Sequence, residues 1–252
     1  MTVPEYVPGH GLLSGKVVVV TAAAGTGIGF ATAKKAQEEG ATVVVSDWHE
    51  RRLAETAEQL GVLGIRCDVT VEEDVQHLLA ATVAAHGRVD VLVNNAGLGG
   101  TAALVDMTDE EWAKVLDVTL TGTMRCTRAA LRLLRDQGSG VIVNNASVIG
   151  WRAQEGQAHY AAAKAGVMAL TRTAGVEGAT FGVRVNAVSP SIAMHAFLAK
   201  VTTDELLSEL SSREAFGRAA EPWEVANVIV FLASDYSSYM TGEVVSVSSQ
   251  HP

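Results

Sequence analysis

The chain has 252 residues, of which 48% are hydrophobic, and a formal net charge of -9. This length is enough for a full hydrophobic core and is most simply one domain, and the acidic balance without a long Lys/Arg cluster argues against a nucleic-acid partner. No apolar run is long enough to span a bilayer, and the first residues lack the pattern of a signal peptide. Cys67 and Cys126 lack the spacing of a metal site or a redox pair, so we expect free buried thiols, no metal, no membrane contact and a cytoplasmic location.

Short β-branched runs alternate with alanine-rich amphipathic stretches along the chain. The predicted strands are Val17–Val20, Thr42–Val45, Gly64–Cys67, Val89–Val93, Val141–Val143, Val183–Val188 and Glu243–Val247. The predicted helices are Ile28–Glu39, Glu50–Leu60, Val71–His86, Asp109–Leu134, His159–Thr180 and Pro222–Ala233. Continuous apolar strands that alternate with helices indicate a parallel sheet covered on both faces. We therefore predict a single doubly wound α/β domain of the Rossmann type over residues 1–252, with seven parallel strands.

A glycine-rich turn over residues 21–29 joins the first predicted strand to the first helix. Glycines permit a tight turn there and let backbone N–H groups approach a pyrophosphate at the helix N-terminus. The turn is not a strict G-x-G-x-x-G, and taken alone it could be an ordinary connection between a strand and a helix. Its place at the first βα crossover favours a dinucleotide site. The expected contact residues are Gly25, Thr26, Gly27 and Ile28.

Asp47 ends the second predicted strand, about twenty residues after this turn, as expected for a carboxylate that binds the adenosine ribose hydroxyls. It would repel the 2′-phosphate of NADP. Arg51 and Arg52 could attract that phosphate, but they lie further into the next helix, so NAD is the predicted coenzyme and NADP the less favoured one.

Small and polar residues follow the third and fourth predicted strands, as Asp68-Val69 and Asn94-Asn95-Ala96-Gly97. Each motif alone is more often a strand-ending turn. Together with the glycine turn and Asp47, they are expected to border the adenine and ribose.

A tyrosine and a lysine lie four residues apart in the alanine-rich stretch His159-Tyr160-Ala161-Ala162-Ala163-Lys164, and Ser147 lies thirteen residues before the tyrosine. If the stretch is helical, Lys164 lies one turn from Tyr160 on the same face, where an ammonium can lower a phenol pKa from about 10 toward the working pH. Such a phenol can exchange a proton with a substrate alcohol or ketone, and Ser147 can hold the same substrate oxygen. The spacing alone also fits an ordinary helix.

The least regular part of the chain, from Ser189 to Arg218, follows a strand end, where open α/β sheets bind ligands. We expect a substrate lid over about residues 190–218. The alternative is an ordinary surface loop.

With these motifs in place, the chain resembles the short-chain dehydrogenases/reductases over nearly everything from Gly15 to Val247. The resemblance implies that Tyr160 is the general acid/base, that Lys164 lowers its pKa and binds the nicotinamide ribose, and that Ser147 orients the substrate oxygen. The resemblance also implies that hydride passes directly to or from the nicotinamide. The family also implies a homotetramer with two-fold axes, formed in part by the helices Asp109–Leu134 and His159–Thr180.

Four positions depart from the family pattern. Ala22 replaces the first glycine of a turn that is one residue longer than usual, and Thr119 stands where many relatives have an asparagine of the proton relay. A threonine hydroxyl can substitute there, or water can reach Lys164 by another route. After the sixth strand Pro190-Ser191 replaces Pro-Gly, with Ile192 as the expected carboxamide contact and His195 near the usual threonine. The end, residues 248–252, replaces the common Asp-Gly-Gly and is interpreted as a tail with no catalytic role.

Residues 145–154 and the ending Gln250-His251-Pro252 narrow the resemblance to the actinobacterial dehydrogenases of steroid C/D-ring breakdown. This subgroup implies oxidation of a ring hydroxyl on a bicyclic hydrindane acid carried as its coenzyme A thioester. Trp151 and Arg152 are then expected at the pocket mouth, against an apolar ring and an anionic group, although a packed tryptophan beside a solvated arginine fits equally well. The alternatives are a 3-oxoacyl reductase that uses NADPH, and a catalytically silent dinucleotide-binding sensor.

Overall fold

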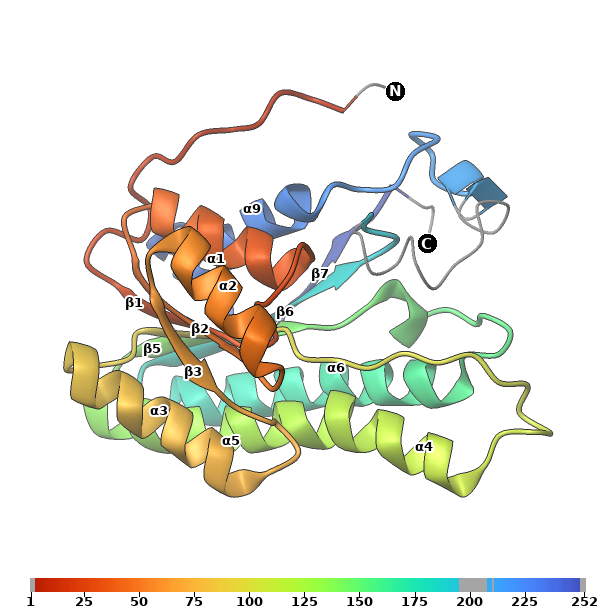
Figure 1. The fold of residues 1–252 in the computed structure, drawn as a ribbon, viewed down its shortest axis with the longest axis horizontal. Coiled ribbons are helices and arrows are strands. Elements are labelled where there is room, and N and C mark those ends of the chain that lie inside the picture. The colour runs from red at the N-terminus through yellow and green to blue at the C-terminus, as the bar shows by residue number, and fades with distance from the viewer. Residues whose placement is uncertain (1–2, 195–207, 210, 250–252) are drawn as a thin grey trace.

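The computed structural model describes residues 3–194, 208–209 and 211–249. Its strands form one sheet in the order β3-β2-β1-β4-β5-β6-β7, and every neighbouring pair is parallel. Figure 1 shows the sheet between two layers of helices, with α1, α2 and α9 on one face and α3 to α6 on the other. The predicted doubly wound architecture is confirmed.

The observed elements follow the predicted ones closely. The strands are β1 Val17–Val20, β2 Thr42–Asp47, β3 Leu63–Arg66, β4 Val91–Asn94, β5 Gly140–Asn145, β6 Val183–Pro190 and β7 Val244–Val247. The main helices are α1 Ile28–Glu38, α2 Glu50–Leu60, α3 Glu72–His86, α4 Asp109–Leu116, α5 Gly122–Gln137, α6 Ala158–Ala179 and α9 Pro222–Ala233.

Alternate residues of the central strands enter two separate cores. In β1, Val18 and Val20 pack with the α1 and α9 layer, whereas Val19 packs with the α3 and α5 layer. Side chains of a strand point alternately to opposite faces, so an unbroken valine run is what a sheet covered on both sides requires. The parallel pairing of these strands brings the residues that follow each carboxyl end to the same edge of the sheet.

The helix predicted over Asp109–Leu134 is three consecutive segments in the structure. A π-helical turn, η1 Asp117–Thr121, separates α4 from α5, and α5 continues to Gln137. Thr108 begins α4 with a capping box, in which its hydroxyl accepts a hydrogen bond from the backbone N–H of Glu111 and the Glu111 side chain bonds back. A π-turn holds one more residue than an α-turn, and such turns occur frequently at functional sites.

None of the helices among the described residues is both long and apolar enough to cross a membrane.

Candidate active site

Ser147, Tyr160 and Lys164 meet beyond the carboxyl end of β5. Ser147 lies two residues after this strand and is 9% exposed, while Tyr160 and Lys164 lie in the first two turns of α6. The Lys164 ammonium nitrogen lies 5.6 Å from the centre of the Tyr160 ring, as the four-residue spacing on a helix predicts. The Ser147 hydroxyl is hydrogen-bonded to the Tyr160 phenol. One serine and one phenol can therefore hold the same substrate oxygen.

Burial governs the ionisation of both groups on α6. It raises the pKa of the Tyr160 phenol, and the hydrogen bond from Ser147 acts in the opposite direction. It also lowers the pKa of the Lys164 amine to about 8. The expected lowering of the phenol pKa by the ammonium is therefore not the dominant influence in this structure, because burial disfavours both charged forms at once.

The lysine is held in place by the backbone of β5. Lys164 is 3% exposed, and its Nζ donates a hydrogen bond of 2.5 Å to the carbonyl oxygen of Asn145. The Asn145 side chain donates to Oδ1 of Asn95 at 3.0 Å, while its own buried Oδ1 has no partner among the described residues. This unpaired oxygen is a ready acceptor for a ligand hydroxyl or a water molecule at the site.

A short 3-10 helix, η2 Val148–Gly150, carries Ser147 against α6. The Ser147 Oγ accepts from the Ile149 backbone N–H at 3.3 Å. A Cβ atom at Gly150 would lie 2.7 Å from Cε of Met168 and 3.0 Å from the backbone nitrogen of Ala165. Glycine at position 150 therefore permits the close packing that sets the distance from Ser147 to Tyr160.

Thr119 is fully buried in η1 and holds the segment after β4. Its hydroxyl accepts from the Leu98 N–H at 2.9 Å and donates to the Leu98 carbonyl at 3.1 Å. Gly97 lies beneath this pair, and a Cβ there would be 3.4 Å from Nζ of Lys164. The only proton of the threonine hydroxyl is thus given to Leu98, which leaves one lone pair for a water molecule.

The sequence predicted the Asn94-Asn95 pair at the site but not the hydrogen bonds that join it to Asn144 and Asn145. Asn94 Nδ2 donates to Thr127 Oγ1 at 3.1 Å and to Asn144 Oδ1 at 2.9 Å, and Asn144 Nδ2 donates to Thr171 Oγ1 at 2.9 Å. These bonds tie β4 and β5 to α5 and α6. The adjacent dipeptides Asn94-Asn95 and Asn144-Asn145, each at a predicted strand end, are the sequence signal that could have indicated this pairing.

The glycine turn between β1 and α1 is tight, and it leads into a helix start that has no side-chain cap. Gly25 has φ +103°, and a Cβ at Gly29 would lie 2.5 Å from both the Ala22 carbonyl oxygen and the Asn95 amide nitrogen. Gly27 begins α1 without a side-chain cap, and no acidic residue occupies the first turn. The free amides and the positive end of the helix dipole are therefore available to an anion. Thr26 is the exposed residue of this turn and Ile28 the first of α1.

Ala22 adopts the conformation that the family's first glycine usually supplies. Its φ is +48°, the only positive value at a non-glycine position among the described residues. The Asn95 side chain fixes it by donating to the Ala22 carbonyl at 2.9 Å and to the Thr21 carbonyl at 3.2 Å.

Asp47 is buried beside the glycine turn, with 6% of its surface exposed. One carboxylate oxygen accepts from the Ala24 N–H at 3.3 Å and the other from the His49 N–H at 2.9 Å. Each oxygen retains a further lone pair for a ribose hydroxyl. The carboxylate is thus fixed next to the glycine turn.

The residues after β3 line the same edge. Asp68 Oδ1 accepts from the backbone N–H and the hydroxyl of Thr70, at 2.9 and 2.7 Å. Val69 packs against Gly122 at the start of α5, where a Cβ would lie 2.7 Å from the valine side chain. Ala96 borders the core beneath them.

The predicted substrate residues are only partly described. Pro190 ends β6 and pairs in register with Val247, and Ile192 follows in a half-buried position. Trp151 is 51% exposed directly after η2, and Arg152 beside it is partly buried. His195 and the middle of the predicted lid, residues 195–207 and 210, lie outside the described residues.

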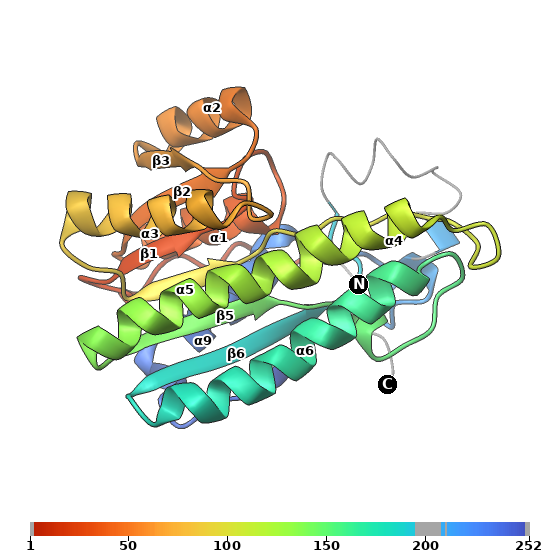
Figure 2. The same ribbon diagram turned by 90° about the horizontal axis from the view of Figure 1, so that it is seen from below.

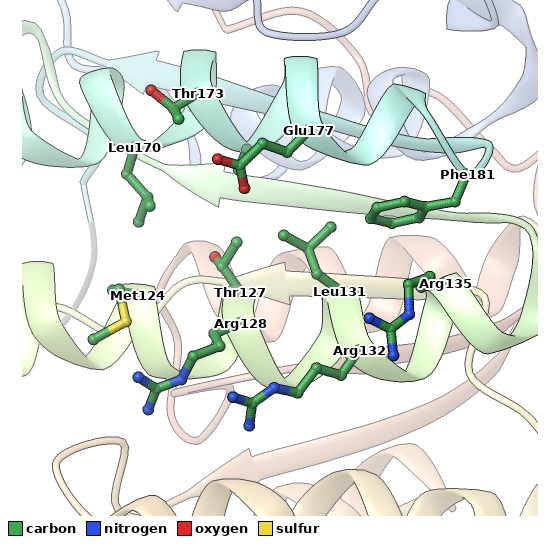
Figure 3. Close-up of a pocket in the computed structure, with 11 residues that line it drawn as sticks. Met124, Thr127, Arg128, Leu131, Arg132, Arg135, Leu170, Thr173, Glu177 and Phe181 are labelled. Atoms are coloured by element: carbon green, nitrogen blue, oxygen red, sulfur yellow. The ribbon is translucent and has the colours of Figure 1, made fainter.

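A separate groove of about 380 Å³ lies between α5 and α6, near their C-terminal halves. Figure 3 shows Arg128, Arg132 and Arg135 along one wall and Glu177 and Phe181 along the other. The two helices run side by side on one face of the sheet (Figure 2). The described residues contain no group of three or more side chains that could hold a metal ion.

Comparisons with known proteins agree with this geometry. Residues 22–249 match the family model described as enoyl-(acyl carrier protein) reductase. The chain is 66% identical to the (5R,7aS)-5-hydroxy-7a-methyl-1-oxo-2,3,5,6,7,7a-hexahydro-1H-indene-carboxyl-CoA reductase of Mycobacterium tuberculosis, over 99% of this chain and 98% of that protein. It is 40% identical to a 3-oxoacyl-[acyl-carrier-protein] reductase of Thermotoga maritima, over 93% of this chain and 97% of that protein.

The fold also matches that of a solved relative. The crystal structure of a short chain dehydrogenase from Mycobacterium smegmatis superposes with a TM-score of 0.89 at 62% identity, covering 100% of this chain and 99% of that one. The family binds a nicotinamide dinucleotide, and its named members are reductases and dehydrogenases acting on alcohol and carbonyl groups. The chain therefore belongs to the short-chain dehydrogenase/reductase family and is an oxidoreductase.

Proposed function

We propose that this oxidoreductase uses NAD to interconvert a ring hydroxyl and a ketone on a bicyclic acid carried as its coenzyme A thioester. The observation that carries the proposal is the convergence of Ser147, Tyr160 and Lys164 at the sheet edge that also holds Asp47 and the glycine turn. The substrate class rests on the 66% identity to the hexahydroindene-carboxyl-CoA reductase and on the resemblance of residues 145–154 to steroid-ring dehydrogenases.

The proposed chemistry divides between the coenzyme and the side chains. When bound, the nicotinamide ring accepts or donates the hydride. Tyr160 transfers the proton of the substrate hydroxyl, and Ser147 holds the same oxygen by a hydrogen bond. Lys164 receives its orientation from the Asn145 carbonyl and places a titratable amine one turn below the phenol. Its lowered pKa lets the amine pass a proton onward near neutral to weakly alkaline pH.

The preference for NAD over NADP follows from Asp47. Its carboxylate is buried and fixed by two backbone N–H groups, so it cannot swing away from a 2′-phosphate. Asp47→Ser should lower the KM for NADP and raise the KM for NAD, while kcat on each saturating coenzyme changes little. An Arg51→Ala control should leave both unchanged, because Arg51 is ion-paired with Glu55 on the exposed face of α2. Preferential use of NADP by the wild-type enzyme would contradict the assignment.

Trp151 and Arg152 are our candidates for substrate contacts. The close packing of η2 on α6 fixes Trp151 relative to Ser147, and an indole that is half exposed offers apolar surface to a fused ring system. Trp151→Ala should raise the KM for a bicyclic thioester more than the KM for a short linear one. The same increase for both substrates would contradict a role in recognising rings.

Tyr160→Phe tests the enzymatic role itself. It removes the phenol hydroxyl and leaves the aromatic ring, so turnover should fall by about a hundredfold or more while coenzyme affinity is retained. Coenzyme binding is measured by NADH fluorescence. If the wild-type protein binds NADH but turns over no hydroxyacyl thioester, a silent dinucleotide-binding sensor is the better account.

A 3-oxoacyl reductase is the second candidate, and the 40% identity to the Thermotoga maritima enzyme is the observation that favours it. It predicts NADPH as reductant and linear substrates. Asp47 speaks against it, because a fixed buried carboxylate repels the 2′-phosphate of NADPH.

Association into a homotetramer is also part of the proposal. The groove between α5 and α6 carries apolar Leu131 and Phe181 together with arginines on α5 and Glu177 on α6. In a two-fold contact, Glu177 of each copy would face the arginines of the other, and the apolar floor would be covered. The free, buried thiols of Cys67 and Cys126 support a reducing, cytoplasmic location.

A further inference from the structure

A buried carboxylate joins the end of the chain to the returning arm of the segment that follows β6. Glu214 is 4% exposed, and its Oε2 accepts from the Ser249 hydroxyl at 2.8 Å and from the Ser249 N–H at 3.3 Å. In the opposite direction, the Ala215 N–H donates to the Ser249 carbonyl at 3.0 Å. Three hydrogen bonds thus connect two pieces of chain that are far apart in sequence.

The backbone around Glu214 keeps this carboxylate aimed at the tail. The Glu214 N–H donates to the Ser211 carbonyl at 3.2 Å, and the Glu214 carbonyl accepts from Gly217 at 2.8 Å. Gly217 has φ +65°, a conformation that glycine adopts without strain. The turn over residues 211–217 is therefore closed on itself and presents Glu214 as a fixed acceptor.

The outgoing arm of the same segment is tied to the same place. Ser191 N–H donates to the Val247 carbonyl at 3.2 Å, which extends the β6–β7 ladder by one step. Ala193 forms a parallel bridge with Ala220, through bonds from Met194 N–H to the Ala220 carbonyl at 2.8 Å and from Ala220 N–H to the Ile192 carbonyl at 2.9 Å. The outgoing arm, the returning arm and the tail after β7 form one hydrogen-bonded unit.

This unit lies where an open α/β sheet binds its ligands. The carboxyl ends of β6 and β7 are adjacent in the sheet, and Ile192 follows β6 at the point expected to contact the nicotinamide carboxamide. The bridge between Ala193 and Ala220 connects the returning arm directly to the Ile192 carbonyl.

We propose that Glu214 and Ser249 form a clasp that positions the two arms at residues 191–194 and 211–220 for substrate binding, so that the chain after β7, as far as Ser249, is part of the substrate-binding architecture. Both are positioning residues: neither contacts the reacting atoms. The clasp acts on the bound thioester and rests on the proposed function. The tail, interpreted from the sequence as a segment without a catalytic role, thereby acquires a role in affinity.

Steady-state kinetics with NAD and a bicyclic hydroxyacyl-CoA separate affinity from chemistry. Glu214→Ala removes both bonds to Ser249 from the carboxylate, and Ser249→Ala removes only the hydroxyl bond. We expect the KM for the thioester to rise about tenfold in Glu214→Ala and less in Ser249→Ala, with kcat within about threefold of wild type. Ser249→Thr keeps the hydroxyl and should restore the wild-type KM.

Ser212→Ala is the matched control. It removes a serine hydroxyl from the same turn, but this hydroxyl donates to the Glu209 carbonyl at 2.7 Å within the turn and does not contact the tail. Its kinetics should equal those of wild type. An unchanged KM in a folded Glu214→Ala variant, or an equal rise for Ser212→Ala, would overturn the clasp.

Amide exchange provides a readout that needs no substrate. The Ala215 amide is bonded to Ser249, so it should exchange faster in Glu214→Ala and Ser249→Ala than in wild type or in Ser212→Ala. Trypsin should also cut sooner after Arg213, whose side chain is 61% exposed. If the wild-type enzyme turns over no thioester, the proposed function fails, whereas unchanged Ala215 exchange in both clasp variants overturns the clasp itself.

Discussion

At the scale of single residues, burial decides how the two titratable groups on α6 behave. The four-residue spacing of Tyr160 and Lys164 is readable in the sequence and places them on one helix face. Their degree of burial is not readable, because β5 and the segment after β4 cover them. The spacing therefore predicts the shared helix face, whereas the burial that raises the pKa of Tyr160 is set by the fold.

Lys164 should make stability depend on pH in a defined window. The unfolded amine keeps its proton to about pH 10, whereas the folded amine loses it near pH 8. Between these values the unfolded state binds more protons, so the free energy of unfolding should rise with pH. Lys164→Met, which cannot titrate, should lack this rise.

Urea unfolding of the wild type and of Lys164→Met, at several pH values between about 8 and 9.5, measures the free energy of unfolding of each protein. This pH range lies below the range in which Tyr160 titrates in the unfolded chain. As the pH rises, the free energy of unfolding of the wild type should increase steadily relative to that of Lys164→Met. Parallel curves would mean that Lys164 keeps an ordinary pKa.

Ala22 carries a local strain that a single substitution should relieve. The left-handed region costs an alanine about 1–2 kcal/mol, part of which returns because glycine has greater freedom in the unfolded chain. Ala22→Gly should raise the free energy of unfolding by about 0.5–1 kcal/mol, measured by urea unfolding. Ala24→Gly, two residues away at a negative φ, should lower it by a similar amount. A loss of stability in both variants would contradict the strain.

The bonding partners of some residues cannot be read from the sequence, for one reason. Thr119 meets Leu98, and Glu214 meets Ser249, only after the sheet has formed. No local periodicity connects such partners. The asparagine pairs at the ends of β4 and β5 are an intermediate case, because their positions are readable but their bonding partners on α5 and α6 are not.

At the scale of elements, the sequence pattern predicted where the helices lie but did not predict the change from α-helix to π-helix. The predicted helix over Asp109–Leu134 carries a favourable pattern throughout, and nothing in it signals the π-turn at Asp117–Thr121. The turn places Thr119 beneath Leu98, so a tertiary contact accompanies the irregularity. The boundaries of α2 and α9 agree with the prediction because clear caps, Gly61 after α2 and Pro222 at the start of α9, mark them.

The packing of η2 on α6 should be sensitive to one added methyl group. Gly150→Ala would place a Cβ 2.7 Å from the Met168 side chain and 3.0 Å from backbone atoms of Lys164 and Ala165. The methionine can move but the helix backbone cannot, so η2 must shift and Ser147 with it. We expect kcat to fall about tenfold, because small displacements in an active site are costly.

NADH affinity is the internal control for Gly150→Ala, because the glycine turn and Asp47 lie on β1 and β2 and do not contact η2. Fluorescence titration should give an unchanged affinity. An unchanged kcat would show that η2 tolerates the methyl group without moving Ser147.

At the scale of the whole molecule, the alternation of strands and helices predicted the parallel sheet and its two covered faces. The valine runs of β1 and β2 require burial on both sides, which only this architecture supplies. Periodicity says nothing about the order in which the strands lie side by side. That order depends on right-handed crossovers and on which helices pack together, and it comes from the structure.

The proposed two-fold contact predicts a change in assembly. Val176 is 72% exposed on α6 beside Glu177, and a charge there would be buried in the contact. Val176→Asp should reduce the particle mass measured by light scattering after gel filtration. Val71→Asp adds the same charge at the N-cap of α3, where aspartate is favourable, and should keep the wild-type mass. A monomeric wild-type protein would contradict the proposed tetramer.

The most direct test of the proposed function is the absorbance of NADH formed when the purified enzyme meets NAD and a panel of hydroxyacyl-CoA thioesters that includes bicyclic hydrindane acids. The account predicts turnover with NAD on a bicyclic thioester, lost in Tyr160→Phe. Turnover confined to NADPH and linear 3-oxoacyl substrates would contradict both the coenzyme and the substrate assignment.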